Sequence, residues 1–445
     1  MINRPLPLTS MEEFWFWEDR PAYPASCFNR LHFDGELNRT AFKSATDVAI
    51  RRHPLLRSIV ERTGRFEMKW IPLENPDVSI QWSKGTSAAP FPPASRQDLT
   101  KEIGVRFYIR ENGASTDAVL QLHHACMDAI GMFSFLNDLL ISYAKEVDGS
   151  DGDLKLPPID MNRLYNRGSF EITPGRFLQL LPKLGLGLQG VKAFLFNSPA
   201  PLIPHETHSY YDTLPEGYPR IMSQVFDEES SKHIGETAAH GDVTVNDLLI
   251  RDLFLALWGW QKEQGNHDPS NWLRLIVPIN MRQPRDDTMP AVNCISMVFP
   301  QRRYKNFQNP NHLLRGIHGE MGLIKQSQLG LTFNISLQIC RWLPGGLRKR
   351  VREDVCRISC GFTNLGNVLS WSQLPKNDGC IVAGNVTLKG MEIGIPLRPY
   401  TCASFSLHWY ANRLSVCLHY DPRVLSKDQA TRLHNWYMQQ IELSS

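Results

Sequence analysis

The order of helices and strands constrains the fold of this chain more than any other feature, because a similar order occurs in both halves. In the first half, Leu37, Ala41 and Ala45 recur at helical spacing, and Pro54 ends that helix because proline disfavours helical backbone at the residue before it. Strand-like stretches separated by Gly, Pro, Asn and Ser follow, and another helix begins near Gly131. The predicted strands are LRSIVER, RFEMKWIP, VSIQWSKG, VRFYIREN and the apolar run 117–124.

The second half repeats this alternation. Thr244 is placed to cap a long helix, and Ala411 and Asn412 form the two-residue loop of a β-hairpin. Two rounds of interleaved helices and strands predict an α/β sandwich that is duplicated within one chain. The other predicted segments are strands at 220–227, 272–282 and 293–300, a strand–turn–strand at 361–371, and helices at 310–326, 334–356 and 426–443.

The length of the chain agrees with two lobes. At about 100–200 residues per domain, 445 residues make two or three domains. Residues 149–218 are rich in Gly, Pro, Ser and Asn and show weak periodicity, which is typical of a long connection. We therefore predict an N-terminal lobe at 1–150, a crossover linker at 151–218 and a C-terminal lobe at 219–445.

Charge, cysteine usage and hydropathy exclude several classes of protein. The net charge is only +3, so we expect no nucleic-acid partner. The nine cysteines are odd in number and irregularly spaced, which favours reduced thiols in a cytoplasmic protein. No apolar run reaches about 18 residues, so we expect no membrane span. Residues 177–197 read either as an in-plane amphipathic segment or, as we prefer, as a packed crossover.

The stretch QLHHACMDAIG at 121–131 carries the chemistry. Neighbouring side chains on a strand point to opposite faces, so His123 and His124 cannot both face one core. At the end of the strand, one ring can enter a cleft while the other supports it. Asp128 follows on the next turn, where it can fix the local geometry. The alternative interpretation is that both histidines are structural, which is the usual role of a single histidine at a strand end.

Other catalytic motifs are missing from the sequence. It contains no G-x-S-x-G turn for a serine nucleophile, no H-E-x-x-H spacing for a metal, and no glycine-rich loop for a nucleotide cofactor. A histidine near neutral pH can take a proton from a hydroxyl or amine. The simplest remaining reaction is direct transfer, in which the deprotonated acceptor attacks an acyl group that is already activated as a thioester.

HHACMDA resembles the H-H-x-x-x-D-G motif of the chloramphenicol acetyltransferase-like, CoA-dependent acyltransferase superfamily, which includes condensation domains and standalone alcohol or polyketide O-acyltransferases. Four further stretches are similar to this family in order and spacing: RRHPLLRS (51–58), TVNDLLIRDLFLALWGW (244–260), VPINMR (277–282) and FTNLG (362–366). The resemblance covers most of the chain. It implies two α/β sandwich lobes that form a V-shaped pseudo-dimer around a central tunnel, in a monomer.

The resemblance also implies roles for individual residues. His124, the second histidine, is the general base, and His123 helps to hold the loop. Asp128 is structural and pairs with Arg282, a two-pronged contact suited to pinning a loop. Asn364 and Gly366 lie where the second half closes over the tunnel. A solvated surface pair is the alternative for Asp128 and Arg282.

The sequence departs from the motif at one position, because Ala129 stands where the family has glycine and Gly131 comes two residues later. If this position needs a positive φ, alanine is costly there. If it does not, the Cβ of Ala129 only narrows the tunnel beside the base.

Three functions follow, in order of preference. The first is an acyltransferase, of the kind found in secondary metabolism, that moves an acyl group from CoA or a carrier protein to a small alcohol or amine and has no tightly bound cofactor. The second is a condensation-type enzyme that forms an amide between carrier-bound substrates. The third is an inactive homologue that binds a ligand or a protein, for which Ala129 is the support.

The aromatic stretch EEFWFWEDR at 12–20 has two interpretations. It is either a flap over the acceptor entrance or an N-terminal segment that packs its rings on the body of the protein, which we prefer.

Overall fold

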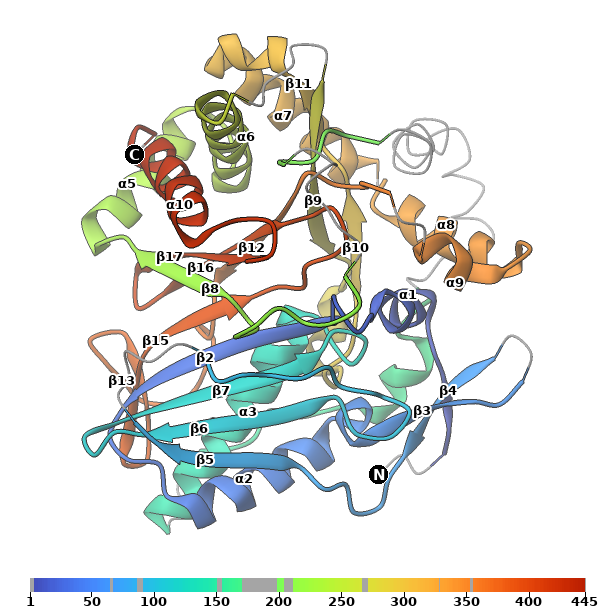
Figure 1. Cartoon of the computed structure of the whole chain (residues 1–445). Coiled ribbons are helices and arrows are strands. Elements are labelled where there is room, and N and C mark those ends of the chain that lie inside the picture. Colours follow the sequence, from blue (N-terminus) through green and yellow to red (C-terminus); the bar gives the residue numbers. More distant parts are fainter. Residues whose placement is uncertain are drawn as a thin grey trace.

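The structure is a computed structural model of the whole chain. It describes residues 4–64, 67–85, 91–149, 154–169, 198–203, 211–265, 271–327, 329–352 and 355–444. Most of the predicted linker, including the segment 177–197, lies outside these residues. Two lobes are present, each with a seven-stranded sheet, and they lie one above the other in Figure 1. The predicted fold, a duplicated α/β sandwich, is therefore confirmed.

The sheet of the first lobe has the strand order β13-β14-β15-β2-β7-β6-β5. Helices α2 and α3 pack together and cover one face of it (Figure 1). The strands are β2 (Ser26–Asp34), β5 (Ser79–Lys84), β6 (Val105–Glu111), β7 (Ser115–His123), β13 (Lys376–Asn377), β14 (Cys380–Ala383) and β15 (Val386–Gly394), and the helices are α2 (Arg39–Arg52) and α3 (Ala129–Asp148). A small three-stranded sheet beside it contains β1 (Leu6–Pro7), β3 (Ser58–Arg62) and β4 (Met68–Pro72).

The sheet of the second lobe has the order β10-β9-β12-β16-β17-β8, and β11 pairs with β9. Its strands are β8 (Ile221–Val225), β9 (Trp272–Asn280), β10 (Ile295–Val298), β11 (Gln301–Arg303), β12 (Cys360–Asn367), β16 (Ala403–Tyr410) and β17 (Arg413–Tyr420). Its helices are α5 (Glu228–His240), α6 (Val245–Glu263), α7 (Pro310–Gln326) and α10 (Lys427–Glu442). Three more helices lie where the two lobes meet: α1 (Ser10–Glu18), α8 (Leu331–Trp342) and α9 (Gly346–Val351).

Local sequence signals explain many of these element boundaries. Thr244 caps α6 through a capping box with Asp247, as the sequence predicted. Ala411 and Asn412 have φ values of 47° and 62°, which a two-residue hairpin turn between β16 and β17 requires. Proline and glycine at 344–346 divide the helix predicted at 334–356 into α8 and α9. The second strand predicted near residue 371 is wrong, because a turn follows β12 there.

One exchange between the halves of the sequence was not predicted. Strand β15 comes from the C-terminal half, yet it pairs antiparallel with β2 in the sheet of the first lobe. Membership of this sheet therefore crosses the boundary at residue 219, and the division of the chain at 150 and 218 stays a prediction. The main-chain hydrogen bonds between β15 and β2 therefore connect the C-terminal half of the chain to the first lobe.

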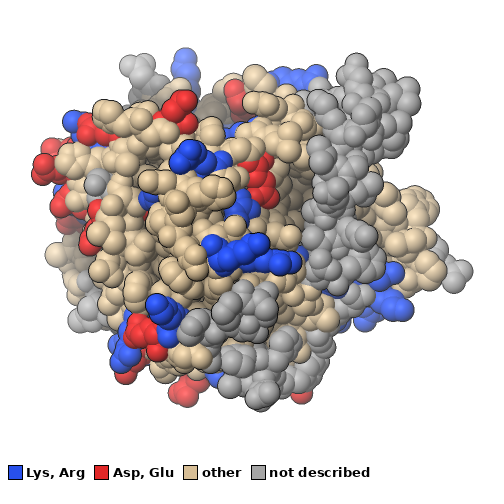
Figure 2. Space-filling view, turned by 90° about the horizontal axis from the view of Figure 1, so that it is seen from above, with Lys and Arg blue, Asp and Glu red and all other residues tan. Residues whose placement is uncertain are grey.

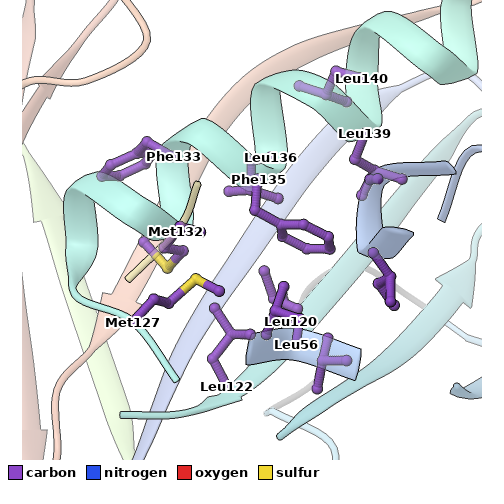
Figure 3. Packing of buried hydrophobic residues seen from close by; sticks show 14 of the residues in the cluster. Leu56, Leu120, Leu122, Met127, Met132, Phe133, Phe135, Leu136, Leu139 and Leu140 are labelled. Atoms are coloured by element: carbon purple, nitrogen blue, oxygen red, sulfur yellow. The ribbon is translucent and has the colours of Figure 1, made fainter. Parts of the chain in front are cut away.

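The core of the first lobe lies between α3 and the sheet, directly behind the HHACMD stretch. Phe135, Leu136 and Leu139 of α3 pack toward Leu120 and Leu122 of β7 (Figure 3). Met127 and Met132 fill the end of this layer, where the chain passes from β7 into α3. The loop that carries His124 thus rests on a packed apolar base.

The surface shows charged residues of both signs (Figure 2), and the cysteines are unpaired. Lysine and arginine as well as aspartate and glutamate occur on the face seen from above (Figure 2). The nine cysteines are free, and all but Cys27 are buried. Among the described helices, none combines the length and the apolar character that a membrane crossing needs.

Candidate active site

His124 lies just after the end of β7, in the loop that leads to α3. Its Nδ1 is 3.1 Å from the main-chain oxygen of Met127. A carbonyl oxygen only accepts hydrogen bonds, so Nδ1 carries the proton and Nε2 keeps its lone pair. The residue as a whole is half-buried, and the main-chain N–H of His124 donates to the main-chain oxygen of Ala25 at 2.7 Å. The loop therefore presents His124 with a basic Nε2.

His123 has the opposite arrangement. Its ring is 1 % exposed, and its Nδ1 accepts a hydrogen bond from the main-chain N–H of Ala125 at 3.1 Å. Because Nδ1 accepts, the proton lies on Nε2, which faces Asp19 Oδ2 at 3.7 Å. His123 is buried in the support of the loop, so its contacts are those of a structural residue.

Asp128 and Arg282 form the two-pronged pair that the sequence predicted. Arg282 Nη1 is 2.7 Å from Asp128 Oδ2, and Nη2 is 2.9 Å from Oδ1. Asp128 also accepts from the main-chain N–H groups of Gly131, as the N-cap of α3, and of Cys294. It is 3 % exposed, so the alternative of a solvated surface pair is wrong. The pair pins the loop of the first lobe to the segment between β9 and β10 of the second.

Sequence reasoning missed Asn293, which holds the same loop. Its Nδ2 donates to the main-chain oxygen of His124 at 2.6 Å and to that of Ala125 at 2.9 Å. Asn293 lies two residues before β10, so the second lobe binds the loop both at Asp128 and at the main chain of His124. No signal in the sequence distinguished Asn293 from other asparagines.

Trp15 of α1 stacks on the imidazole of His124. The two ring centroids are 3.9 Å apart, and the planes are inclined by 12°. Another ring of the same helix, Phe14, packs edge-on against Phe333 of α8. The preferred interpretation of the aromatic stretch, packing on the body, describes Phe14, while Trp15 covers one face of His124. Because the lone pair of Nε2 lies in the plane of the ring, a tryptophan stacked on the face of the ring does not cover that lone pair.

Buried polar contacts hold α1 in this position. Glu12 is fully buried, and its carboxylate accepts from Arg167 Nε at 2.7 Å and from Trp70 Nε1 at 3.0 Å. Glu12 also completes a capping box with Thr9 at the start of the helix. Trp15 is therefore fixed over His124 by contacts of Glu12, one helical turn earlier in α1.

Burial controls the protonation of His124. Desolvation by the surrounding protein lowers the pKa of this imidazole to about 4, and the nearby Asp128 carboxylate opposes the shift only in part. The ring is therefore neutral at physiological pH, as a general base must be.

Ala129, at the position of the motif glycine, is the first residue of α3. It is not among the non-glycine residues with positive φ. Ala129 therefore does not have the positive φ that would make an alanine costly at this position.

Gly131, by contrast, lies where a side chain has no room. A Cβ there would be 3.0 Å from Met127 Cβ and 3.1 Å from the main-chain nitrogen of Val292. The glycine thus allows the first turn of α3 to approach the second lobe.

We expect Gly131→Ala to lower the free energy of unfolding by about 1–3 kcal/mol, because the added methyl overpacks this contact. Gly235→Ala is the matched control: this glycine is inside α5, and a Cβ there meets no atom within 4 Å. The control substitution is expected to stabilise the protein slightly through helix propensity. Urea denaturation of both variants measures the difference, and equal midpoints would contradict the close approach at Gly131.

Asn364 and Gly366 lie at the end of β12. Gly366 has a φ of 68°, and its N–H donates to Asn364 Oδ1 at 3.0 Å. Leu365, between them, packs against the core of the first lobe together with Ala129. Within the described residues, the polar contacts of His124 come from Ala25, Met127 and Asn293 and not from this turn. The role of Asn364 and Gly366 in a tunnel stays a prediction.

Comparisons with known proteins bear on the fold. The sequence matches no protein-family model and no curated protein. Solved structures do match over 99 % of the chain. The starter condensation domain of rhizomide synthetase, solved as a mutant in complex with C8-CoA, aligns with a TM-score of 0.68 at 13 % identity over 94 % of its own length.

Two further structures have other descriptions. Polyketide synthase associated protein 5 from Mycobacterium tuberculosis aligns with a TM-score of 0.65 at 13 % identity over 98 % of its length. The epimerization domain of the third module of tyrocidine synthetase B aligns with a TM-score of 0.66 at 12 % identity over 97 % of its length. The chain therefore has the fold of the condensation domains, the chloramphenicol acetyltransferase-like fold.

Proposed function

We propose that this protein is an acyltransferase that moves an acyl group from a thioester donor, either CoA or a carrier protein, to a hydroxyl or amine acceptor. The observation that carries the proposal is the contact between His124 Nδ1 and the main-chain oxygen of Met127 at 3.1 Å. It fixes the tautomer in which Nε2 can accept a proton. The fold alone does not choose the reaction, since one of its solved members is an epimerization domain.

The reaction needs one base and no covalent enzyme intermediate. Nε2 of His124 takes the proton of the acceptor hydroxyl. At the same time, the oxygen of that hydroxyl forms a bond to the carbonyl carbon of the thioester. The π electrons of the carbonyl move to its oxygen and give a tetrahedral intermediate. When this intermediate collapses, the C–S bond breaks and the leaving thiolate takes the proton from Nε2. The products are an ester and a free thiol, and His124 is neutral again.

The environment of His124 affects both proton transfers. Burial lowers the pKa of its imidazole, so the ring is unprotonated before reaction and its conjugate acid gives the proton readily to the thiolate. Trp15, stacked on one face, and the hydrogen bond from Nδ1 to Met127 restrict the ring to one orientation. Fixed alignment of base, acceptor and thioester supplies much of the rate in such a reaction.

The pH dependence of kcat/KM tests this assignment. His124 loses its basic lone pair when it is protonated, so the rate falls as pH decreases through its pKa of about 4. With an alcohol acceptor, we expect a rate that is flat from pH 7 to pH 5 and decreases only below that. A decrease centred on the ordinary histidine pKa of about 6.5 would contradict a desolvated base. Circular dichroism at each pH confirms that the protein stays folded.

A mass-spectrometric screen tests the function itself. The purified protein is incubated with acetyl- to palmitoyl-CoA and with mixed alcohols and amines, and ester or amide products are measured. Product from acyl-CoA alone supports the acyltransferase and counts against a condensation-type enzyme that needs two carrier-bound substrates. If no donor gives a product even in a single turnover, the protein is one that only binds a ligand.

A further inference from the structure

The indole N–H of Trp15 is a buried hydrogen-bond donor without an acceptor. Its Nε1 is buried, and no hydrogen-bond partner for it is present among the described residues. Two other tryptophans that contact α1 differ in this respect. Trp17 Nε1 donates to Glu13 at 3.2 Å. Trp70 Nε1 donates to Glu12 at 3.0 Å. A buried donor that stays unpaired lowers the stability of a protein, so its presence at Trp15 calls for an explanation.

The unpaired donor lies directly against the candidate base. The ring centroids of Trp15 and His124 are 3.9 Å apart, and the ring planes are inclined by 12°. Nε1 is part of the stacked indole, so its N–H lies in the layer next to the imidazole. The N–H of Trp15 and the lone pair of His124 Nε2 each lie in the plane of their own ring. A base and a hydrogen-bond donor therefore occupy two adjacent, nearly parallel layers.

Packing from both lobes holds the indole in this position. Trp15 packs against the core of the first lobe and also against the apolar cluster that α1 forms with α8 and α9. Phe14 meets the indole edge-on, with the ring centroids 5.3 Å apart. Figure 1 shows α1 between the first lobe and the α8–α9 pair. The N–H is thus fixed before any substrate binds, which is what makes a donor effective in catalysis.

The proposed reaction needs a donor of this kind. When the acceptor oxygen bonds to the thioester carbon, negative charge develops on the carbonyl oxygen, and a fixed N–H group stabilises it. His124 does not serve this purpose, because the proton on its Nε2 goes to the leaving thiolate. Several main-chain N–H groups of the loop are already in use. They are those of His124, Ala125, Cys126 and Asp128, which donate to Ala25, His123, His123 and Val292.

We propose that Trp15 is a second catalytic residue, whose indole N–H donates a hydrogen bond to the thioester carbonyl oxygen as that oxygen becomes negative. This inference rests on the proposed function and adds the group that stabilises its intermediate. The N–H bond of Trp15 stays intact throughout, since an indole N–H only donates. The carbonyl π electrons move to the oxygen during addition and return when the C–S bond breaks. The proton of the acceptor travels to the thiolate through His124 alone.

Trp15→Phe tests the proposal, because it keeps an aromatic ring for the stack and removes the N–H. With an acyl-CoA and an alcohol that the wild type accepts, kcat is expected to decrease about 10²–10³-fold, the effect of removing one such donor. KM should change little, because the carbonyl oxygen carries its full charge only after addition. An unchanged kcat in the folded Trp15→Phe protein would overturn the role of the N–H.

A second variant keeps the shape of the side chain. Benzothienylalanine at position 15 has the bicyclic outline of tryptophan but a sulfur atom in place of the N–H. We expect it to lower kcat as much as Trp15→Phe does. If it restores the kcat of the wild type, the shape of the ring is what matters and the proposal is wrong.

The pH dependence distinguishes a donor from a residue that only buries His124. In both variants, the rate should stay flat from pH 7 to pH 5, as in the wild type, because an aromatic ring still covers the imidazole. If the decrease moves toward the ordinary histidine pKa of about 6.5, Trp15 acts by desolvating the base, and its role as a donor is overturned.

Trp17→Phe is the matched control, because it removes an indole N–H from the same helix. The N–H of Trp17 already donates to Glu13, and the ring contacts of Trp17 among the described residues lie outside the candidate site. Its kcat and KM should equal those of the wild type. Equal losses in Trp15→Phe and Trp17→Phe would indicate a disturbed helix and would count against the proposal.

The outcomes also separate this inference from the proposed function. If the wild type transfers acyl groups, His124→Ala does not, and Trp15→Phe transfers at the wild-type rate, the acyltransferase function stands and the role of Trp15 is overturned. If the wild type turns over no donor, the proposed function and the role of Trp15 are both overturned.

Discussion

The His124→Ala protein is expected to fold normally and to lose acyl transfer by a factor of about 10²–10⁴, the contribution of a positioned general base. Among the described residues, the side chain of His124 makes one hydrogen bond, to Met127. The main chain of the loop is held by the Asn293 side chain and by the main-chain oxygen of Ala25, and the substitution keeps both contacts. Transfer is measured as ester formation from an acyl-CoA and an alcohol that the wild-type protein accepts.

His312→Ala provides a control for the loss of an imidazole at an exposed position of α7. It should leave both turnover and the free energy of unfolding unchanged. Near-normal turnover by a folded His124→Ala protein would remove this residue from the mechanism. A parallel loss in His124→Ala and in His312→Ala would point to a general effect on the protein.

Loss of the arginine that binds Asp128 should have the largest effect on stability. Among the described residues, Arg282→Ala leaves the buried Asp128 carboxylate with the N–H groups of Gly131 and Cys294 as its remaining partners. Breaking a buried pair in this way costs about 3–5 kcal/mol. Transfer should decrease as well, since the loop with His124 loses its attachment to the second lobe. Urea denaturation at pH 7 measures the free energy of unfolding.

Arg302→Ala is the matched control, because Arg302 also pairs with a carboxylate, Glu320, at 2.6 Å but at a more exposed position. A pair of this kind contributes about 0–1 kcal/mol. Arg282→Ala and Arg302→Ala therefore remove contacts of similar length that differ in burial. If both variants unfold at the same urea concentration, Asp128 and Arg282 do not pin the lobes together.

Helices and strands with regular periodicity could be predicted from the sequence, and irregular ones could not. The long helices α3 and α6 have clear caps and apolar faces, and the β16–β17 hairpin has its own turn signal. Strand β2 was missed because Arg30 and His32 interrupt its apolar pattern. Both are compensated by Asp117 of the neighbouring strand β7. Since the pairing strand is about 85 residues away, no local window of sequence reveals it.

The residues of the candidate site also differ in whether the sequence could reveal them. His124, Asp128 and Arg282 could be predicted because the sequence resembles one family motif at HHACMDA, which carries the first two, and another at VPINMR, which carries the third. Trp15 and Asn293 reach His124 only through tertiary packing, so their sequence neighbourhoods do not mark them. The same holds for Arg20, which reaches the main-chain oxygen of Val351 only through tertiary packing, 331 positions later.

The pairing of β15 with β2 has a consequence for how the chain matures. A polypeptide that ends after the first 150 residues leaves the main-chain N–H and C=O groups along one side of β2 without a neighbour. Such an open edge is a template for aggregation. During synthesis, the N-terminal lobe must therefore wait for about 240 further residues before its sheet is complete, and this half of the protein cannot be produced alone as a well-behaved fragment.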